Sequence, residues 1–170
     1  ITFSFDFLTK VLGIPLERLA VTVFAGSSDI PRDMVSAKKW EELGVSLDRI
    51  AYLSDNCWIA GDSGPCGADT EICYFRSDDE IPSKFDPDDE RWVEIWNNVF
   101  MEFYKDSDGK ISELKQKNVD TGMGLERIVS VMEGVRDNYL SSIWKDVIEL
   151  IEDISSLSYE GHEKEMRVLA

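Results

Sequence analysis

The spacing of apolar residues along this chain changes between helical and strand periods, and each period predicts an element. Apolar positions at helical spacing near the amino terminus predict a helix over Phe3–Leu12. The run Leu19–Phe24 is rich in β-branched residues and predicts a strand. Pro31 near a start and Gly44 just beyond an end mark a second helix.

Two short strands and two irregular segments follow. Ile50–Leu53 and Thr70–Phe75 have strand composition, and we expect Asn56–Asp69 between them to be a loop. Ser77–Glu90 is acidic and holds two prolines, which predicts an exposed connection.

The segment Arg91–Tyr104 is apolar on both alternating faces. A helix would also fit its apolar positions Trp92, Ile95, Trp96, Val99 and Phe103. Its β-branched and aromatic content favours a central strand that is covered on both faces. Asp108 and Gly109 then predict a hairpin turn into Lys110–Leu114.

The remainder of the chain reads as helical. Apolar residues predict a helix from Leu125 to about Glu133, an amphipathic helix over Ser141–Leu157 and the start of another in His162–Ala170. Strands and helices in this order predict the α+β class, with an antiparallel sheet flanked by helices and a helical domain that begins near the carboxyl end.

The composition is that of an ordinary globular protein, with 43% hydrophobic and 31% charged residues among 170. The 18 Lys and Arg against 34 Asp and Glu give a formal net charge of −16, which argues against a broad nucleic-acid surface. A small anionic ligand in one local pocket remains compatible with this charge. No apolar run reaches the ~18 residues of a membrane span, and no signal-peptide pattern opens the chain. We therefore expect a cytoplasmic protein without a membrane partner.

The three cysteines, Cys57, Cys66 and Cys73, form no CxxC pair, and the only histidine is His162. We expect a reducing compartment and no zinc site made by this chain. Cys66 belongs to the glycine-rich loop Gly61–Gly67, which serves either as a plain turn or as a place of close backbone approach. No histidine stands near it in the sequence, so we do not expect a catalytic cysteine.

The segment Val119–Arg127 combines an acid, two glycines and a base immediately before a helix. Gly122 and Gly124 allow a tight turn or the close approach of a ligand, and a helix amino terminus is an anion site. Arg127 opposes the helix dipole and needs a compensating anion. Either Glu126 or a bound phosphate could supply it.

Two polar residues stand out in the apolar segment Arg91–Tyr104. Asn97 shares a face with Val99 under strict alternation, and a buried amide there requires hydrogen-bond partners from the backbone or from a ligand. Glu94 is expected on the opposite face. It could bind a cation, although pairing with a Lys or Arg is the favoured interpretation.

Three segments in fixed order carry a family resemblance. They are DNCWIAGDSGPCG with TEICYF, then VEIWNNVFMEF, then VDTGMGLERI. They resemble the catalytic domain of the alanyl-tRNA synthetases, a family of class II aminoacyl-tRNA synthetases in which GMGLER is the third signature motif. The resemblance covers nearly the whole chain, from about Ile1 to about Arg167.

The resemblance implies that alanine attacks the α-phosphate of ATP, with Mg²⁺ assisting the phosphates, and that the alanyl group then passes to tRNA(Ala). By the family pattern, Asp120 holds the α-ammonium group of alanine. Trp58 and Val99 line the small side-chain pocket, and Asn97 hydrogen-bonds at the amino-acid site. A carboxylate is a suitable partner for an ammonium group.

The family pattern also supplies an ATP site. Gly122 and Gly124 leave room for the adenylate, and Gly122 also borders the alanine. Arg127 contacts the ATP phosphates or the adenine and, with Asp120, is a predicted catalytic residue. No metal ligand is predicted firmly, and Glu94 is the one candidate for Mg²⁺.

The sequence also departs from the family pattern. Ala68 and Asp69 replace the second proline and cysteine of GPCGPC, and Leu140 stands where an acid is usual. The resemblance implies the second half of a catalytic domain in residues 1–136 and the start of a helical tRNA-recognition domain in residues 137–170.

The first two class motifs, with the arginine that grips the α-phosphate, and the zinc-bearing editing domain are expected outside this sequence. We therefore expect no ligase activity from the chain alone. Two alternatives stay open: a truncated paralogue that binds nucleotide or amino acid without ligase activity, and a plain interaction module.

Overall fold

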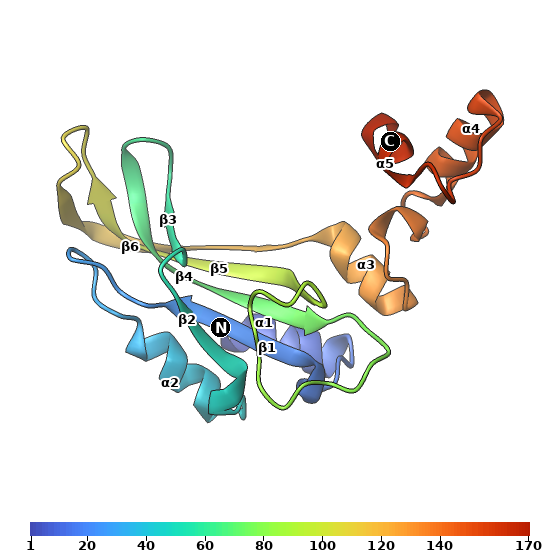
Figure 1. Ribbon diagram of the computed structural model, residues 1–170. Coiled ribbons are helices and arrows are strands. Elements are labelled where there is room, and N and C mark those ends of the chain that lie inside the picture. Colours follow the sequence, from blue (N-terminus) through green and yellow to red (C-terminus); the bar gives the residue numbers. More distant parts are fainter. The chain divides into compact units, whose positions relative to one another are not determined.

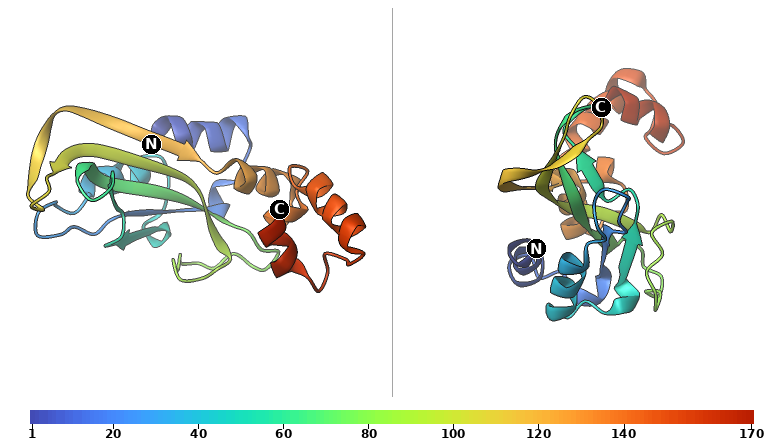
Figure 2. Two further views of the ribbon diagram at one scale, coloured as in Figure 1. Left: turned by 90° about the horizontal axis from the view of Figure 1, so that it is seen from above. Right: turned by 90° about the vertical axis from the view of Figure 1, so that its left-hand side faces the viewer.

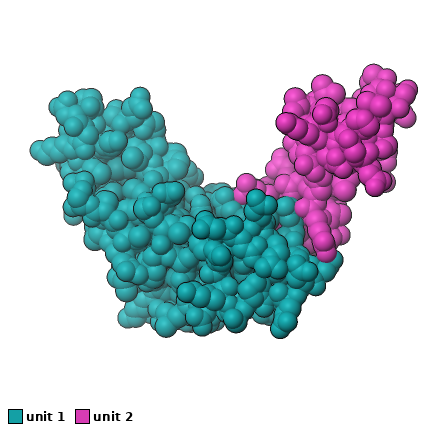
Figure 3. All heavy atoms as spheres, viewed as in Figure 1, with its two compact units in different colours: residues 1–123 teal, residues 124–170 magenta.

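The computed structural model describes all 170 residues, which form two compact units, Ile1–Met123 and Gly124–Ala170 (Figure 3). The first unit contains a six-stranded sheet and two amino-terminal helices, and the second is helical. The α+β class is therefore confirmed. The functional domains predicted as residues 1–136 and 137–170 stay a prediction.

The sheet of the first unit has the strand order β2-β1-β4-β5-β6, and β3 pairs with β4 outside this path (Figure 1). Neighbouring strands are antiparallel except β1 and β2, which are parallel, so the expected antiparallel sheet is in fact mixed. The strands are β1 (Leu19–Phe24), β2 (Ile50–Leu53), β3 (Cys57–Ile59), β4 (Gly64–Phe75), β5 (Trp92–Lys105) and β6 (Ile111–Met123).

Two segments form more strand than the sequence predicts. The expected loop Asn56–Asp69 is wrong, because β3 and the first half of β4 pair there as a hairpin. Gly67 of this hairpin lets β4 approach β5 closely: a Cβ at this position would lie 1.8 Å from the carbonyl oxygen of Phe100. The strand expected over Lys110–Leu114 continues to Met123, and it therefore includes the glycine motif.

The apolar segment expected to be a strand is confirmed as β5, which lies between β4 and β6. The predicted turn after it is also confirmed. The backbone N–H of Gly109 donates to the carbonyl of Asp106 at 3.0 Å, and Gly109 has a φ of 82°, which favours glycine. The connection 77–90 contains neither helix nor strand, as expected.

Two helices cover one face of this sheet. Helix α1 (Thr2–Asp6) continues as a π-helical turn over Phe7–Val11, and α2 (Met34–Glu42) begins at Asp33, whose carboxylate caps it. The hydroxyl of Ser4 donates to Asn98 Oδ1 at 3.3 Å. Trp40 Nε1 donates to Thr70 Oγ1 at 2.8 Å. These bonds fix the helices to the face that carries Asn98 and Thr70.

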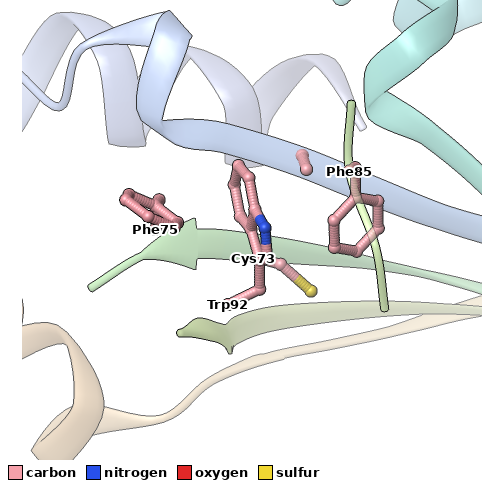
Figure 4. Packing of buried hydrophobic residues seen from close by; sticks show 5 residues of the cluster. Cys73, Phe75, Phe85 and Trp92 are labelled. Atoms are coloured by element: carbon pink, nitrogen blue, oxygen red, sulfur yellow. The ribbon is translucent and has the colours of Figure 1, made fainter. Parts of the chain in front are cut away.

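The connection 77–90 packs against one end of the opposite face (Figure 2). Its Phe85 joins Cys73, Phe75 and Trp92 in a buried cluster with Ala20 (Figure 4). The rings of Phe85 and Trp92 lie 5.1 Å apart, edge to face. Beyond the cluster, this face carries Asp69, Glu71 and Asn97, together with the apolar Val99.

The second unit contains α3 (Leu125–Glu133), α4 (Lys145–Ser155) and α5 (Glu163–Leu169). Gly134 ends α3 in the left-handed conformation, with a φ of 70°. The helices expected at Leu125 and after His162 are confirmed, whereas that expected over Ser141–Leu157 begins only at Lys145. None of the helices is long and apolar enough to span a membrane.

Candidate functional site

The polar face of the first unit is organised by two rows of directly opposed residues. Side chains at paired positions of neighbouring strands point to the same face of a sheet. The two rows cross β4, β5 and β6, and they are Asp69–Val99–Asp120 and Glu71–Asn97–Gly122. The structure therefore brings four of the predicted site residues onto one face, away from α1 and α2.

Glu94 lies on the same face as Asn97, which corrects the sequence prediction. β5 carries one extra residue, Ile95, between its pairs with Ile72 and Cys73 of β4. Such a bulge shifts the alternation by one residue, so positions that differ by an odd number come to share a face. Strict alternation could not reveal this shift.

Asp69 forms the centre of a buried hydrogen-bond network on this face. It is 4% exposed and accepts a bond of 2.7 Å from Asn56 Nδ2. Burial raises the pKa of Asp69 to about 6, against the hydrogen bonds from Asn56 and Asn97, and the charges of Glu71 and Glu94 raise it further. Sequence reasoning missed this residue, although its departure from GPCGPC was a signal.

The Asn97 side chain is held on one side and unsatisfied on the other. Its amide group donates to Asp69, whereas its Oδ1 is buried without a hydrogen-bond partner. Gly122 is its neighbour on β6, and a Cβ there would have no atom within 4 Å. The neighbouring backbone does not satisfy this amide, and an acceptor is left for a donor from a ligand.

Asp120 and the two motif glycines occupy extended backbone, so of the two roles considered for the glycines, the tight turn does not apply. Asp120 is exposed and pairs with Val99, which is 6% exposed. Gly122 continues β6, and Gly124 precedes α3 with a φ of −71°. No residue is left for a turn, because β6 ends at Met123 and the next residue, Gly124, is the N-cap of α3.

Trp58 lies on β3, opposite Gly67 of β4. This residue is 39% exposed. A large aromatic side chain that remains this exposed in a hairpin is available to a ligand. Its role beside Val99 in a small side-chain pocket stays a prediction.

Gly124 and Arg127 belong to the second unit, so they are described apart from the sheet. Gly124 is the N-cap of α3, and a Cβ there would lie 3.3 Å from Arg127 Cδ. The arginine stem thus lies against the glycine in the first turn of the helix. Glu126 is the acidic residue of that turn.

The titratable groups give no sign of a metal centre or of a reactive thiol. No three His, Cys, Asp or Glu side chains are arranged to hold a metal ion. Burial raises the pKa of the Cys66 and Cys57 thiols, which disfavours the nucleophilic thiolate. The role of Glu94 toward Mg²⁺ stays a prediction.

Comparison with known proteins gives the family. The model of the family "tRNA synthetases class II (A)" matches residues 1–170. The alanine–tRNA ligase of Treponema denticola is 48% identical over 96% of this chain and 28% of its own length. Those of Borreliella burgdorferi and Borrelia hermsii are 43% and 40% identical over 98% and 100% of the chain.

The chain spans less than a third of these relatives, 28% to 30% of their length. The matching region carries the polar face of the sheet and the glycine motif together. The chain belongs to the family of class II tRNA synthetases (A).

Proposed function

We propose that this chain is the alanine-binding part of an alanine–tRNA ligase. The whole enzyme would activate alanine with ATP to alanyl-adenylate and pass the alanyl group to tRNA(Ala). The observation that carries the proposal is the polar face, where the exposed Asp120 and the unsatisfied Asn97 Oδ1 lie on adjacent rows of the sheet. The relatives named alanine–tRNA ligase support it.

The face suits alanine because it combines acceptors with a small apolar surface. The carboxylate of Asp120 and the oxygen of Asn97 would receive the α-ammonium group, since a cation bonds strongly to a carboxylate. Val99 lies between Asp69 and Asp120 in its row and would contact the methyl group. Trp58 would close the same pocket.

The residues proposed to bind ATP are two glycines and an arginine of the segment Val119–Arg127. The open space over Gly122 would leave room for the adenylate, and Gly124 and Arg127 would serve the nucleotide and its phosphates. The alanine carboxylate oxygen would form a bond to the α-phosphorus while pyrophosphate leaves. Catalysis of this kind depends on positioning and charge neutralisation.

Mg²⁺ would neutralise charge on the phosphates when bound. A single protein carboxylate fits this role, because Mg²⁺ usually keeps several waters and takes one or two carboxylates together with substrate phosphates. Glu94 is the candidate ligand, since it shares the face with Asn97.

The proposal extends to the organisation of the protein. Residues 1–136 would belong to the catalytic domain, and residues 137–170 would begin the helical domain that recognises tRNA. Protein synthesis would place the enzyme in the cytoplasm.

Binding of a non-hydrolysable alanyl-adenylate analogue, in which a sulfamate replaces the phosphate, tests the proposal. Calorimetry on the 170-residue chain should show binding that Asp120→Ala weakens by at least about tenfold, or ~1.4 kcal/mol. Asp108→Ala is the matched control, because Asp108 is also an exposed acid but lies in the β5–β6 turn region. Equal effects of the two substitutions would refute the proposed site.

A truncated paralogue without ligase activity is the second candidate, favoured by Asp69 and Leu140, which depart from the family pattern. Aminoacylation by the complete gene product distinguishes the two. Transfer of alanine to tRNA would exclude the paralogue, and analogue binding without transfer would favour it.

A further inference from the structure

The carboxyl group of Asp69 is fixed beside Asn97 by buried hydrogen bonds. Asn56 Nδ2 donates to Asp69 Oδ1 at 2.7 Å and also to Thr22 Oγ1 at 2.8 Å, which ties the network to β1. Asn56 and Asp69 are 2% and 4% exposed. Glu71 and Glu94 are only partly buried and Asp120 is exposed, so Asp69 is the one fully buried carboxylate on this face.

The bond from Asn97 to Asp69 determines which end of the Asn97 amide points away from Asp69. An amide has a donor nitrogen and an acceptor oxygen on opposite sides, and either end fits the same space. Since Asp69 accepts from the nitrogen, the oxygen lies on the side of the amide away from Asp69. That oxygen is buried without a partner.

We propose that Asp69 is a positioning residue for the amino-acid substrate: it holds the Asn97 nitrogen and so presents Asn97 Oδ1 to the α-ammonium group. The inference rests on the proposed alanine site and deepens it, because Asp69 selects for an ammonium group without touching it. An ammonium group has three donors and can bond to Asn97 and Asp120 together. A hydroxyl has one donor and cannot.

The substitution Asp69→Asn tests this role, because the new amide can donate to Asn97 Oδ1 and occupy the acceptor. The ¹⁵N-labelled 170-residue chain is titrated by NMR with L-alanine and, separately, with L-lactate, in which a hydroxyl replaces the ammonium group. We expect Asp69→Asn to weaken L-alanine binding by about tenfold and L-lactate binding by less than about twofold. The side-chain amide resonance of Asn97 should shift in the same variant.

Glu71→Gln is the matched control. It removes a negative charge from the same strand and face, and the Glu71 carboxylate accepts from Thr22 Oγ1 at 3.0 Å. L-alanine binding should stay within about twofold of the wild type. A loss in Glu71→Gln equal to that in Asp69→Asn would overturn the positioning role, because it would reflect only the net charge of the face. So would equal losses for L-alanine and L-lactate.

A measurement on the wild-type chain does not depend on how a variant folds. When Asp69 takes up a proton, its hydrogen bond with Asn97 changes, so the Asn97 amide resonance should move with a midpoint near pH 6, the value to which burial raises the pKa of Asp69. The other titratable groups that face Asp69 are Glu71, Glu94 and Cys57. A midpoint that Glu71→Gln leaves in place identifies Asp69, and an Asn97 resonance that does not titrate overturns the proposal.

Failure of the proposed function has a different signature. If the wild-type chain binds L-alanine and Asp69→Asn binds it equally well, the positioning role is wrong while the alanine site stands. If the wild-type chain binds no L-alanine, both are wrong.

Discussion

Two glycines of the sheet have opposite surroundings, although both lie in strands. A Cβ at Gly67 would lie 1.8 Å from the Phe100 carbonyl oxygen, whereas one at Gly122 would meet no atom within 4 Å. The first glycine is therefore required by the packing of the chain itself. The second is not, so its open space is available to a ligand.

Alanine substitution at these glycines separates folding from binding. Gly67→Ala should lower the free energy of unfolding by about 3 kcal/mol or more, because the backbone of β4 or β5 must move. Gly122→Ala should change it by less than about 1 kcal/mol. Gly122→Ala should nevertheless weaken binding of the alanyl-adenylate analogue. Urea denaturation and calorimetry measure the two effects, and equal stability losses would contradict the distinction.

Asp69 should lower the stability of the folded protein as the pH rises, which is opposite to the usual effect of an acidic residue. Burial raises its pKa to about 6 from the ordinary 3.8, so the folded protein holds this proton more tightly than the unfolded chain. Ionisation of Asp69 therefore costs folding free energy as the pH rises from about 4 to about 6, on the order of 3 kcal/mol in total.

The variant Asp69→Asn isolates this contribution from that of the other carboxylates. The unfolding free energy of the wild type minus that of the variant should fall as the pH rises from about 4 to about 7. Urea denaturation at several pH values measures it. A difference that is constant or rises over this range would contradict the raised pKa.

The sequence predicted the side chains of the site better than their arrangement. The family motifs identified Asp120 and Asn97 as site residues. Their position on a common face depends on the β5–β6 register, which no local sequence pattern encodes. Glu94 was assigned to the wrong face because a single bulge residue in β5 reverses the alternation. Asp69 was not predicted as part of the network, since its partner Asn56 lies across a hairpin that was expected to be a loop.

At the scale of elements, the strands with apolar side chains were predictable and the polar strand was not. β1 and β5 bury β-branched and aromatic residues, which predict strands directly. β6 is exposed along most of its length and has no apolar alternation, so only its pairing with β5 makes it a strand. Its first four residues, Ile111–Leu114, were predicted from the turn at Gly109.

The edge position of β6 should be visible in hydrogen exchange. β4 pairs with β1 and β5, whereas β6 pairs with β5 alone. Alternate amides of β6 therefore lack a strand partner, and they should exchange at least about 100-fold faster than the amides of β4. Amide exchange followed by NMR measures this. Equal protection along the two strands would show that another strand, from this chain or a second copy, covers the edge.

At the scale of the whole molecule, charge is the dominant feature. A formal net charge of −16 on 170 residues produces self-repulsion in the folded state. The connection 77–90 concentrates part of this charge, and Arg91 pairs with only two of its acids, Asp79 and Asp89. Any attraction to the phosphates of a nucleic acid must therefore come from local groups rather than from the overall field of this chain.

Salt should consequently stabilise the protein. Raising NaCl from about 20 mM to about 500 mM shortens the Debye length from roughly 20 Å to below 5 Å and screens the repulsion, so the melting temperature should rise by about 3 °C or more. The double substitution of Asp88 and Glu90 by lysine, at two exposed positions of the connection, should raise the melting temperature at low salt and reduce the response to salt. Serine at the same positions should have a smaller effect, because it removes charge without reversing it. Scanning calorimetry measures all three proteins, and a melting temperature that falls with NaCl would show that attractive ion pairs, not repulsion, dominate the electrostatics of this fold.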